Sequence, residues 1–254
     1  MMMCVQKSIW AAAMLSGAGV LAEPLLVSHF DSVTDADYSV GNYVTVQAGA
    51  IQWPLVTSID PKFGDGCLDL TGGTALQYHL RDNFNLGKGT IELWVNPQAA
   101  DAGSDNYLFS IIKNGANRIY LRRSVSQDGS QQQLYLYLAV NGISKTLVSG
   151  YQDVSRFLSV GSWHHIAMTW DLTKAAGADE VSLYADGENL VADRTLTFGE
   201  EWGEEPSRLS IGCYSAVAKS YASAYIDELR ISDDIVYEGS SYAVPSSPFE
   251  VPGN

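Results

Sequence analysis

The sequence predicts an all-β protein, built as an antiparallel sandwich or barrel. Hydrophobic residues recur at every second position in several short runs, and the 3.6-residue period of a helix is not seen after the first 22 residues. The dipeptides Asn114-Gly115, Asn141-Gly142 and Asp186-Gly187 follow or interrupt these runs and suit tight hairpin turns. Short strands separated by glycine turns at near-regular spacing indicate this fold class.

Four runs show the alternation most clearly. In chain order they are TIELWVNP, QLYLYLAVNG, SWHHIAMTWD and VSLYADGENLV, which begin at Thr90, Gln133, Ser162 and Val181. Adjacent side chains on a strand point to opposite faces, so His164 and His165 in the third run are not expected to act together.

The N-terminal segment 1–22 reads as a signal peptide. It carries one lysine, no acid, and an apolar run too short to span a bilayer comfortably, and Val20 and Ala22 supply small residues at the −3 and −1 positions. We expect cleavage before Glu23 and a secreted protein, extracellular or periplasmic, with no membrane insertion afterwards. An uncleaved N-terminal anchor is the alternative.

The composition excludes some partners. The chain has 254 residues, 46% of them hydrophobic, and a formal net charge of −14. Nucleic-acid binders and proteins that dock on anionic lipid need basic surfaces, so neither partner is expected. The length suits one large β domain, which we place at 23–236. The Ser/Pro-rich segment 237–254 is expected to be an extended tail.

Two cysteines remain after removal of the signal peptide. Cys67 and Cys213 are an even number in an exported chain, which suits a disulfide. Both lie in apolar, strand-like runs, so the sequence is equally compatible with two buried free thiols.

Seven segments occur in an order typical of one superfamily. They are LLVSHFD, KFGDGCLDLTGG, GTIELWVNP, SWHHIAMTWD, VSLYADGEN, LSIG and YIDELRIS. The series resembles the laminin-G-like/concanavalin A-like jelly-roll superfamily, particularly its bacterial and phage-associated members. The resemblance implies an antiparallel two-sheet jelly-roll sandwich, with Trp163 and Trp170 between the sheets. Residues 44–61 are longer and more apolar than in the family, and we expect an added edge strand there.

The resemblance also implies a structural calcium ion at the sandwich edge. Its carboxylate ligands would be Asp31 near the first strand, Asp37, and Asp227 at the start of the last strand, with Asp35 and Asn42 as further oxygen donors. Calcium takes six to eight oxygens. The alternative is that Asp227 caps its strand by accepting hydrogen bonds from backbone N–H groups.

No catalytic motif is found. Retaining glycosidases of this fold place two carboxyl groups about 5 Å apart, through the spacing E-x-D-x-x-E or E-x-D-x-E, and no glutamate here has it. A nucleophile elbow, a zinc-ligand spacing and a phosphate-binding loop are also missing. We predict a protein that is not an enzyme; a divergent glycosidase or polysaccharide lyase is the weaker alternative.

The function that the resemblance favours is a binding module for a glycan or a cell-surface protein. Sugar rings stack on exposed aromatic side chains, and five residues on outer faces or in loops are candidates, although each also suits plain cross-strand packing. They are Tyr135, Tyr137, Tyr151, Trp202 and Tyr214. The rival interpretation is a structural protein that assembles into a surface layer or appendage, and therefore forms oligomers.

Overall fold

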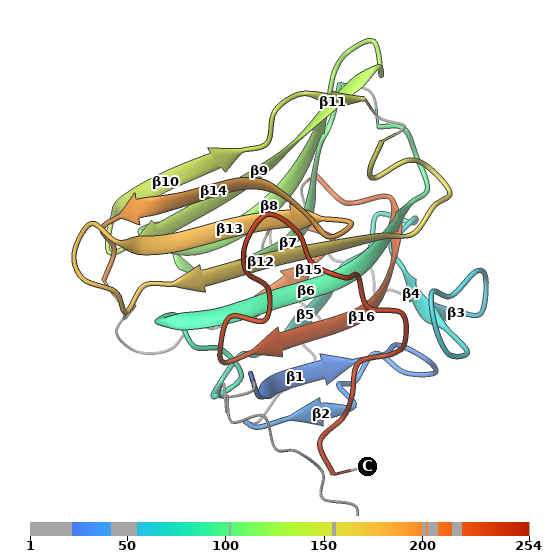
Figure 1. Ribbon diagram of the computed structural model, residues 1–254. Coiled ribbons are helices and arrows are strands. Elements are labelled where there is room, and N and C mark those ends of the chain that lie inside the picture. The colour runs from blue at the N-terminus through green and yellow to red at the C-terminus, as the bar shows by residue number, and fades with distance from the viewer. Residues whose placement is uncertain are drawn as a thin grey trace, which may run out of the picture.

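Two antiparallel β-sheets pack face to face (Figure 1). The computed structural model describes residues 22–41, 55–101, 103–153, 156–199, 202, 208–214 and 220–253. These residues contain no helix, so none is available to span a lipid bilayer. The predicted fold class, an all-β antiparallel two-sheet sandwich, is confirmed. The predicted signal peptide lies outside the described residues except for Ala22.

One sheet has nine strands, seven of them in a continuous order from β14 to β2. That order is β14 (Glu188–Leu196), β13 (Asp179–Ala185), β12 (His164–Asp171), β6 (Lys88–Pro97), β16 (Ala224–Ser232), β1 (Pro24–Ser28) and β2 (Tyr38–Ser39). Strand β4 (Cys67–Asp69) pairs with β16, and β3 (Leu55–Thr57) pairs with β4. Strand β3 is the edge strand expected within residues 44–61, of which 44–54 lie outside the described residues.

The other sheet has seven strands and lies behind the first in Figure 1. Its order is β10 (Ile143–Val148), β9 (Gln131–Val140), β8 (Asn117–Val125), β7 (Asp105–Asn114), β15 (Arg208–Ile211) and β5 (Leu76–Tyr78), with β11 (Gln152–Asp153) paired to β9.

The core lies between the sheets and is filled by the alternating apolar residues. Leu134, Leu136 and Leu138 of β9 are fully buried, as are Met168 and its neighbours on β12. Such burial from both inner faces is the main favourable term in the folding of a sandwich.

The two tryptophans of the SWHHIAMTWD run lie in different places. Trp170 is in the core, and its ring nitrogen donates to the carbonyl of Asn85 at 3.0 Å. Trp163 is only half-buried and donates to the carbonyl of Asp60 at 3.0 Å, so the expectation that it fills the space between the sheets is wrong. It precedes β12, where the alternation has not yet begun.

The C-terminal segment differs from the extended tail that its composition predicts. Residues 237–253, here called the C-terminal strap, run across the outer face of the nine-stranded sheet (Figure 1). The hydroxyl of Tyr237 donates to the Glu92 carboxylate at 2.6 Å, and the Tyr242 hydroxyl lies 2.6 Å from Nδ1 of His165. The two tyrosine rings stack at 3.7 Å.

The far end of the strap is held through Phe249. Its backbone N–H donates to Glu228 at 2.8 Å, and its carbonyl accepts from Nε2 of His29 at 2.9 Å. The Arg230 guanidinium lies 4.3 Å from the centre of the phenyl ring, and Phe249 is only 5% exposed. The strap is therefore part of the folded domain.

Under the strap lies a buried charge network centred on Glu92. Its carboxylate accepts from Arg230 at 2.6 and 2.8 Å and from Nε2 of His165 at 3.1 Å. Burial raises the pKa of Glu92, but the hydrogen bond from His165 and the charge of Arg230 outweigh it, so the net pKa is lowered. Glu92 is therefore ionised, fully paired and closed off from solvent.

Replacing Phe249 by alanine tests the docking of the strap. We expect the free energy of unfolding to fall by about 2–4 kcal/mol, because a buried aromatic ring is lost together with its contact to Arg230. Urea unfolding followed by circular dichroism measures the change. The exposed Val40→Ala variant is the control and should stay within about 0.5 kcal/mol of the parent protein. Equal midpoints for both variants would show that the strap is not docked.

Candidate functional site

The outer face of the seven-stranded sheet carries a row of polar and aromatic side chains. Residues in register on neighbouring strands point to the same face. One row crosses all six consecutive strands from β5 to β10 and contains no aliphatic residue; its members on β5, β15 and β7 are buried, whereas those on β8, β9 and β10 reach solvent. It consists of Gln77, Ser210, Ser110, Tyr120, Tyr137 and Thr146.

Tyrosine rings cluster around the middle of this row. The rings of Tyr120 and Tyr137 stack at 4.8 Å with an interplanar angle of 7°. Tyr107 lies 5.2 Å from Tyr120 and 4.9 Å from Tyr214, which follows β15. All four are half-buried, so part of each ring faces solvent. Burial is the main cause of the raised pKa values of Tyr107 and Tyr120.

Arginines from β8 flank the tyrosines. Arg118 donates to the hydroxyls of Tyr214 at 3.0 Å and Tyr137 at 3.4 Å. The guanidinium of Arg122 lies 4.3 Å from the ring centre of Tyr135 and also pairs with Asp105. The hydrogen bond from Arg118 lowers the pKa of Tyr137. We call this surface the tyrosine–arginine face: Tyr107, Arg118, Tyr120, Arg122, Tyr135, Tyr137, Arg208 and Tyr214.

Three of the five predicted ligand residues lie on this face: Tyr135, Tyr137 and Tyr214. Tyr151 is 66% exposed but lies apart, directly before β11. The prediction that Trp202 binds a ligand is wrong, because this residue is 4% exposed and its ring packs 5.8 Å from that of Phe84 at the core. The sequence around Trp202 is rich in glutamate, which is typical of a solvated loop, but an indole ring this large gains more by burial.

Sequence reasoning missed Tyr107, Tyr120 and the arginines. The signal was present in NRIYLRRSV, the sequence of β8, whose burial alternates like that of β9. The adjacent arginines hide the alternation of β8 in the sequence, because Arg123 is polar yet faces inward while Arg122 faces outward.

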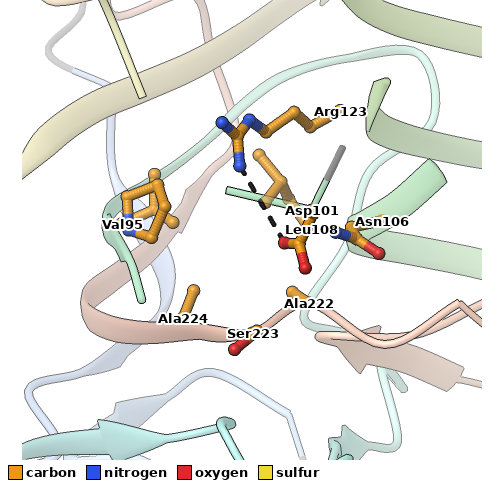
Figure 2. A pocket seen from close by; sticks show the side chains of 9 residues that line it. Val95, Asp101, Asn106, Leu108, Arg123, Ala222, Ser223 and Ala224 are labelled. Atoms are coloured by element: carbon orange, nitrogen blue, oxygen red, sulfur yellow. Dashed lines mark ion pairs between the residues drawn. The ribbon is translucent and has the colours of Figure 1, made fainter. Parts of the chain in front are cut away.

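Arg123 lines a small cavity beside β6 and the segment before β16 (Figure 2). It is 3% exposed, donates to Gln132 at 2.7 Å, and lies 4.0 Å from the Asp101 carboxylate. The cavity holds about 10 Å³, which is room for about one water molecule. This cavity is therefore too small for a sugar.

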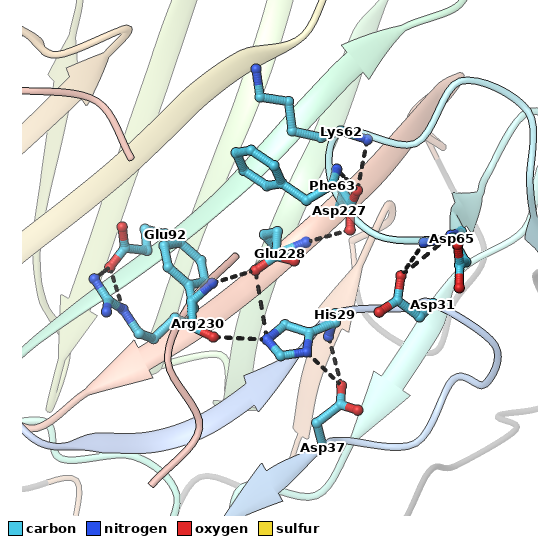
Figure 3. Close-up of polar contacts among 12 residues, drawn as sticks. His29, Asp31, Asp37, Lys62, Phe63, Asp65, Glu92, Asp227, Glu228 and Arg230 are labelled. Carbon is cyan, nitrogen blue, oxygen red and sulfur yellow. Dashed lines mark hydrogen bonds and ion pairs between the residues drawn. The ribbon is translucent and has the colours of Figure 1, made fainter. Parts of the chain in front are cut away.

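Asp227, which was predicted to bind calcium, accepts hydrogen bonds from backbone N–H groups (Figure 3). Asp227 is fully buried and accepts from the N–H groups of Lys62 at 2.8 Å, Phe63 at 3.2 Å and Glu228 at 2.9 Å. Burial raises the pKa of Asp227 to about 8 and that of Glu228 to about 7. This geometry matches the alternative in which Asp227 bonds backbone N–H groups.

The other predicted calcium ligands also face N–H groups. Asp31 accepts from Asp65 at 2.6 Å and Gly66 at 3.4 Å, and Asp37 accepts from the N–H of His29 at 2.7 Å. Among the described residues, which do not include Asn42, no three His, Cys, Asp or Glu side chains form a metal-binding group. The carboxylates of Asp31, Asp37 and Asp227 therefore point at N–H donors, whereas calcium requires a shell of six to eight oxygens. Calcium binding stays a prediction.

Of the two alternatives for Cys67 and Cys213, the structure has the buried thiols, and no disulfide joins them. Cys67 lies on β4 of the nine-stranded sheet, whereas Cys213 follows β15 of the seven-stranded sheet. Burial is the main cause that raises the pKa of each thiol to about 12, so neither is a reactive thiolate. Each packs as a small apolar side chain.

Two histidines have contacts that resemble catalytic pairs. One is closed off from solvent, and the other is held by structural hydrogen bonds. His165 touches Tyr242 and Glu92, yet it is 0% exposed beneath the strap. His164 lies between Asp186 at 2.6 Å and the Ser159 hydroxyl at 3.0 Å. Its Nε2 also accepts the Ser159 backbone N–H at 3.0 Å, which makes the ring a cap for the preceding turn.

Comparisons with known proteins agree with this fold. The model of the concanavalin A-like lectin/glucanases superfamily matches residues 70–237, well over half of the chain. No curated protein matches the sequence.

Solved structures similar to this chain include two from botulinum neurotoxins and one from a sialidase. The botulinum neurotoxin serotype C1 binding domain has a TM-score of 0.58 at 12% identity, covering 84% of this chain and 49% of that one. A botulinum neurotoxin type C structure, described through its interaction with two ganglioside molecules, has a TM-score of 0.51 at 12% identity, with 84% and 48% covered. A Ruminococcus gnavus sialidase CBM40 bound to α2,3 sialyllactose has a TM-score of 0.47 at 12% identity, with 85% and 95% covered.

This chain therefore spans about half the length of the botulinum neurotoxin structures. At 12% identity the likeness shows the shared fold alone.

The buried carboxyl of Asp227 predicts a pH-dependent stability. Its pKa in the folded protein is raised, so its contribution is fully present below the ordinary pKa of an aspartate and is lost as the pH rises through about 8. We expect the free energy of unfolding to fall between pH 5 and pH 8, on the order of a few kcal/mol. Asp227→Asn should make this slope shallower in urea titrations, with the remainder due to Glu228, whose pKa is also raised. Exposed Asp65→Asn should keep it, and an unchanged slope in Asp227→Asn would contradict the assignment.

A second measurement addresses calcium. Because the N–H groups already occupy Asp31, Asp37 and Asp227, we expect equal melting temperatures in millimolar calcium and in excess chelator. A rise of several degrees with calcium, lost in Asp227→Ala, would show that the ion displaces these N–H groups and binds.

Proposed function

This chain belongs to the concanavalin A-like lectin/glucanases superfamily, and from its tyrosine–arginine face we propose that it is a non-catalytic glycan-binding module. The observation that carries the proposal is the part of the polar row that reaches solvent, the stacked pair Tyr120 and Tyr137 on β8 and β9. Tyrosine offers a sugar an apolar ring face and a hydroxyl, and arginine offers a fork of N–H donors. A botulinum neurotoxin structure, 48% of which this chain covers, is described through its interaction with two ganglioside molecules, so this fold occurs in a protein that binds glycolipids.

The absence of catalysis is part of the proposal. Glu92 and His165, the buried acid and its histidine partner, are sealed beneath the strap, and Asp227 accepts three N–H groups. None of these groups can reach a polysaccharide. Secretion through residues 1–22 completes the proposal, since a glycan receptor acts on exposed surfaces.

A structural or assembly role is the second candidate, and one observation favours it. Strand β10 lies at the edge of its sheet and exposes Ile143 and Val148, so a second chain could add a strand there. Lys145 on the same strand forms an ion pair with Asp193, and charge on an edge strand opposes such pairing. The glycan-binding proposal therefore has the stronger support.

The test is a glycan array with the parent protein and Tyr137→Ala. We expect the parent to bind a defined set of glycans and the variant to bind them at least tenfold more weakly, about 1.4 kcal/mol, because the stacked pair with Tyr120 is lost. Tyr225→Ala, a half-buried tyrosine on the nine-stranded sheet, is the matched control and should bind like the parent.

Thermal melts must show that both variants are folded. If the parent binds no glycan and sedimentation reveals large oligomers, the assembly role is favoured. Equal losses in Tyr137→Ala and Tyr225→Ala would mean that the tyrosine–arginine face is not the site.

A further inference from the structure

Three arginines lie on the tyrosine–arginine face. Arg208 of β15 and Arg118 of β8 are both in register with Ile112 of β7, so they occupy one row, separated by a single strand. At the usual spacing of strands, their backbones are about 10 Å apart. Arg122 lies four residues along β8, about 13 Å from Arg118. The three side chains therefore share one face of the sheet.

These arginines differ from most other basic residues in how their charge is balanced. Lys88, Lys145, Lys174, Arg156, Arg194 and Arg230 each form an ion pair with a carboxylate. Among the described residues, Arg118 and Arg208 have no carboxylate partner. Arg122 pairs with Asp105, which is 44% exposed and can be displaced by water or a ligand.

Arg118 is oriented by neutral groups instead. Its N–H groups donate to the hydroxyls of Tyr137 and Tyr214, and its Nε is buried with no hydrogen-bond partner in the described residues. Its guanidinium lies 5.1 Å from the ring centre of Tyr137. A guanidinium that is held in place, charged and free of a carboxylate is suited to receive an anion.

We propose that the tyrosine–arginine face selects acidic glycans, with a sugar carboxylate bound by Arg118 and Arg208 and the ring beside Tyr120 and Tyr137. This inference rests on the proposed glycan-binding function and names its substrate class. The chain carries a net charge of −14. Without local arginines such a protein repels acidic polymers, so two arginines that have no carboxylate partner within the described part of the chain set where an acidic glycan can bind.

The experiment compares two probes with the same sugar backbone: oligogalacturonate, whose carboxyl groups are charged, and its methyl ester, whose carboxyl groups are neutral. Titration calorimetry with the full chain should give at least tenfold tighter binding of the acid form. In the double variant Arg118→Gln/Arg208→Gln this preference should disappear. Lys174→Gln, which removes a positive charge paired with Glu180 near the other sheet, is the control and should keep the preference.

The pair of sialyllactose and lactose serves as a second comparison for a sugar carboxylate on a different backbone. Raising the salt from 50 to 500 mM should weaken binding of the acidic probes and leave the neutral ones unchanged. Melting curves confirm that the variants are folded.

Two outcomes would overturn the proposal, and they are distinguishable. If neutral and acidic probes bind equally, or the double variant keeps the preference, acid selection is wrong while glycan binding stands. If no probe and no arrayed glycan binds the parent protein, the proposed function itself falls.

Discussion

The buried carboxylate of Glu92 is the interaction on which the arrangement of the nine-stranded sheet depends. It lies on β6, a central strand, and an ionised group there is tolerated only if every oxygen is paired. Arg230 from β16, His165 from β12 and Tyr237 from the strap supply those pairs. Removing any one partner leaves the buried carboxylate with a missing hydrogen bond or ion pair. The strap is thus required to close a network that the strands alone leave incomplete.

The two outer faces of the sandwich have opposite characters as a result. The nine-stranded sheet is covered by its own chain, with Phe249 and the tyrosine pair filling the surface over His165. The seven-stranded sheet keeps Tyr120 and Tyr137 half-exposed. Both faces use tyrosine and arginine. The difference is that Arg230 is neutralised by a buried acid, whereas Arg118 is held by hydroxyl groups.

Period-2 alternation was sufficient to predict the strands and the fold class, because a sandwich buries one face of each strand. Tyr135 and Tyr137 followed from the same rule. Composition was a poor guide where a few side chains decide whether a segment docks. The Ser/Pro-rich strap docks through Tyr237, Tyr242 and Phe249, whose partners lie far away in sequence. The state of the cysteines and the N–H groups that occupy Asp227 depend on tertiary contacts, which no local pattern encodes.

The strap also constrains the order in which the domain can form. Tyr237 bonds a residue 145 positions earlier and Phe249 one 220 positions earlier, so these contacts close very long loops. Long-range contacts of this kind form late, because closing a long loop costs conformational entropy before the contact contributes any favourable energy. During synthesis, the strap leaves the ribosome after β1 to β16, the strands that the structure describes. Until Tyr237 has emerged, the Glu92 carboxylate lacks one of its hydrogen bonds, and chaperones would meet the chain in that state.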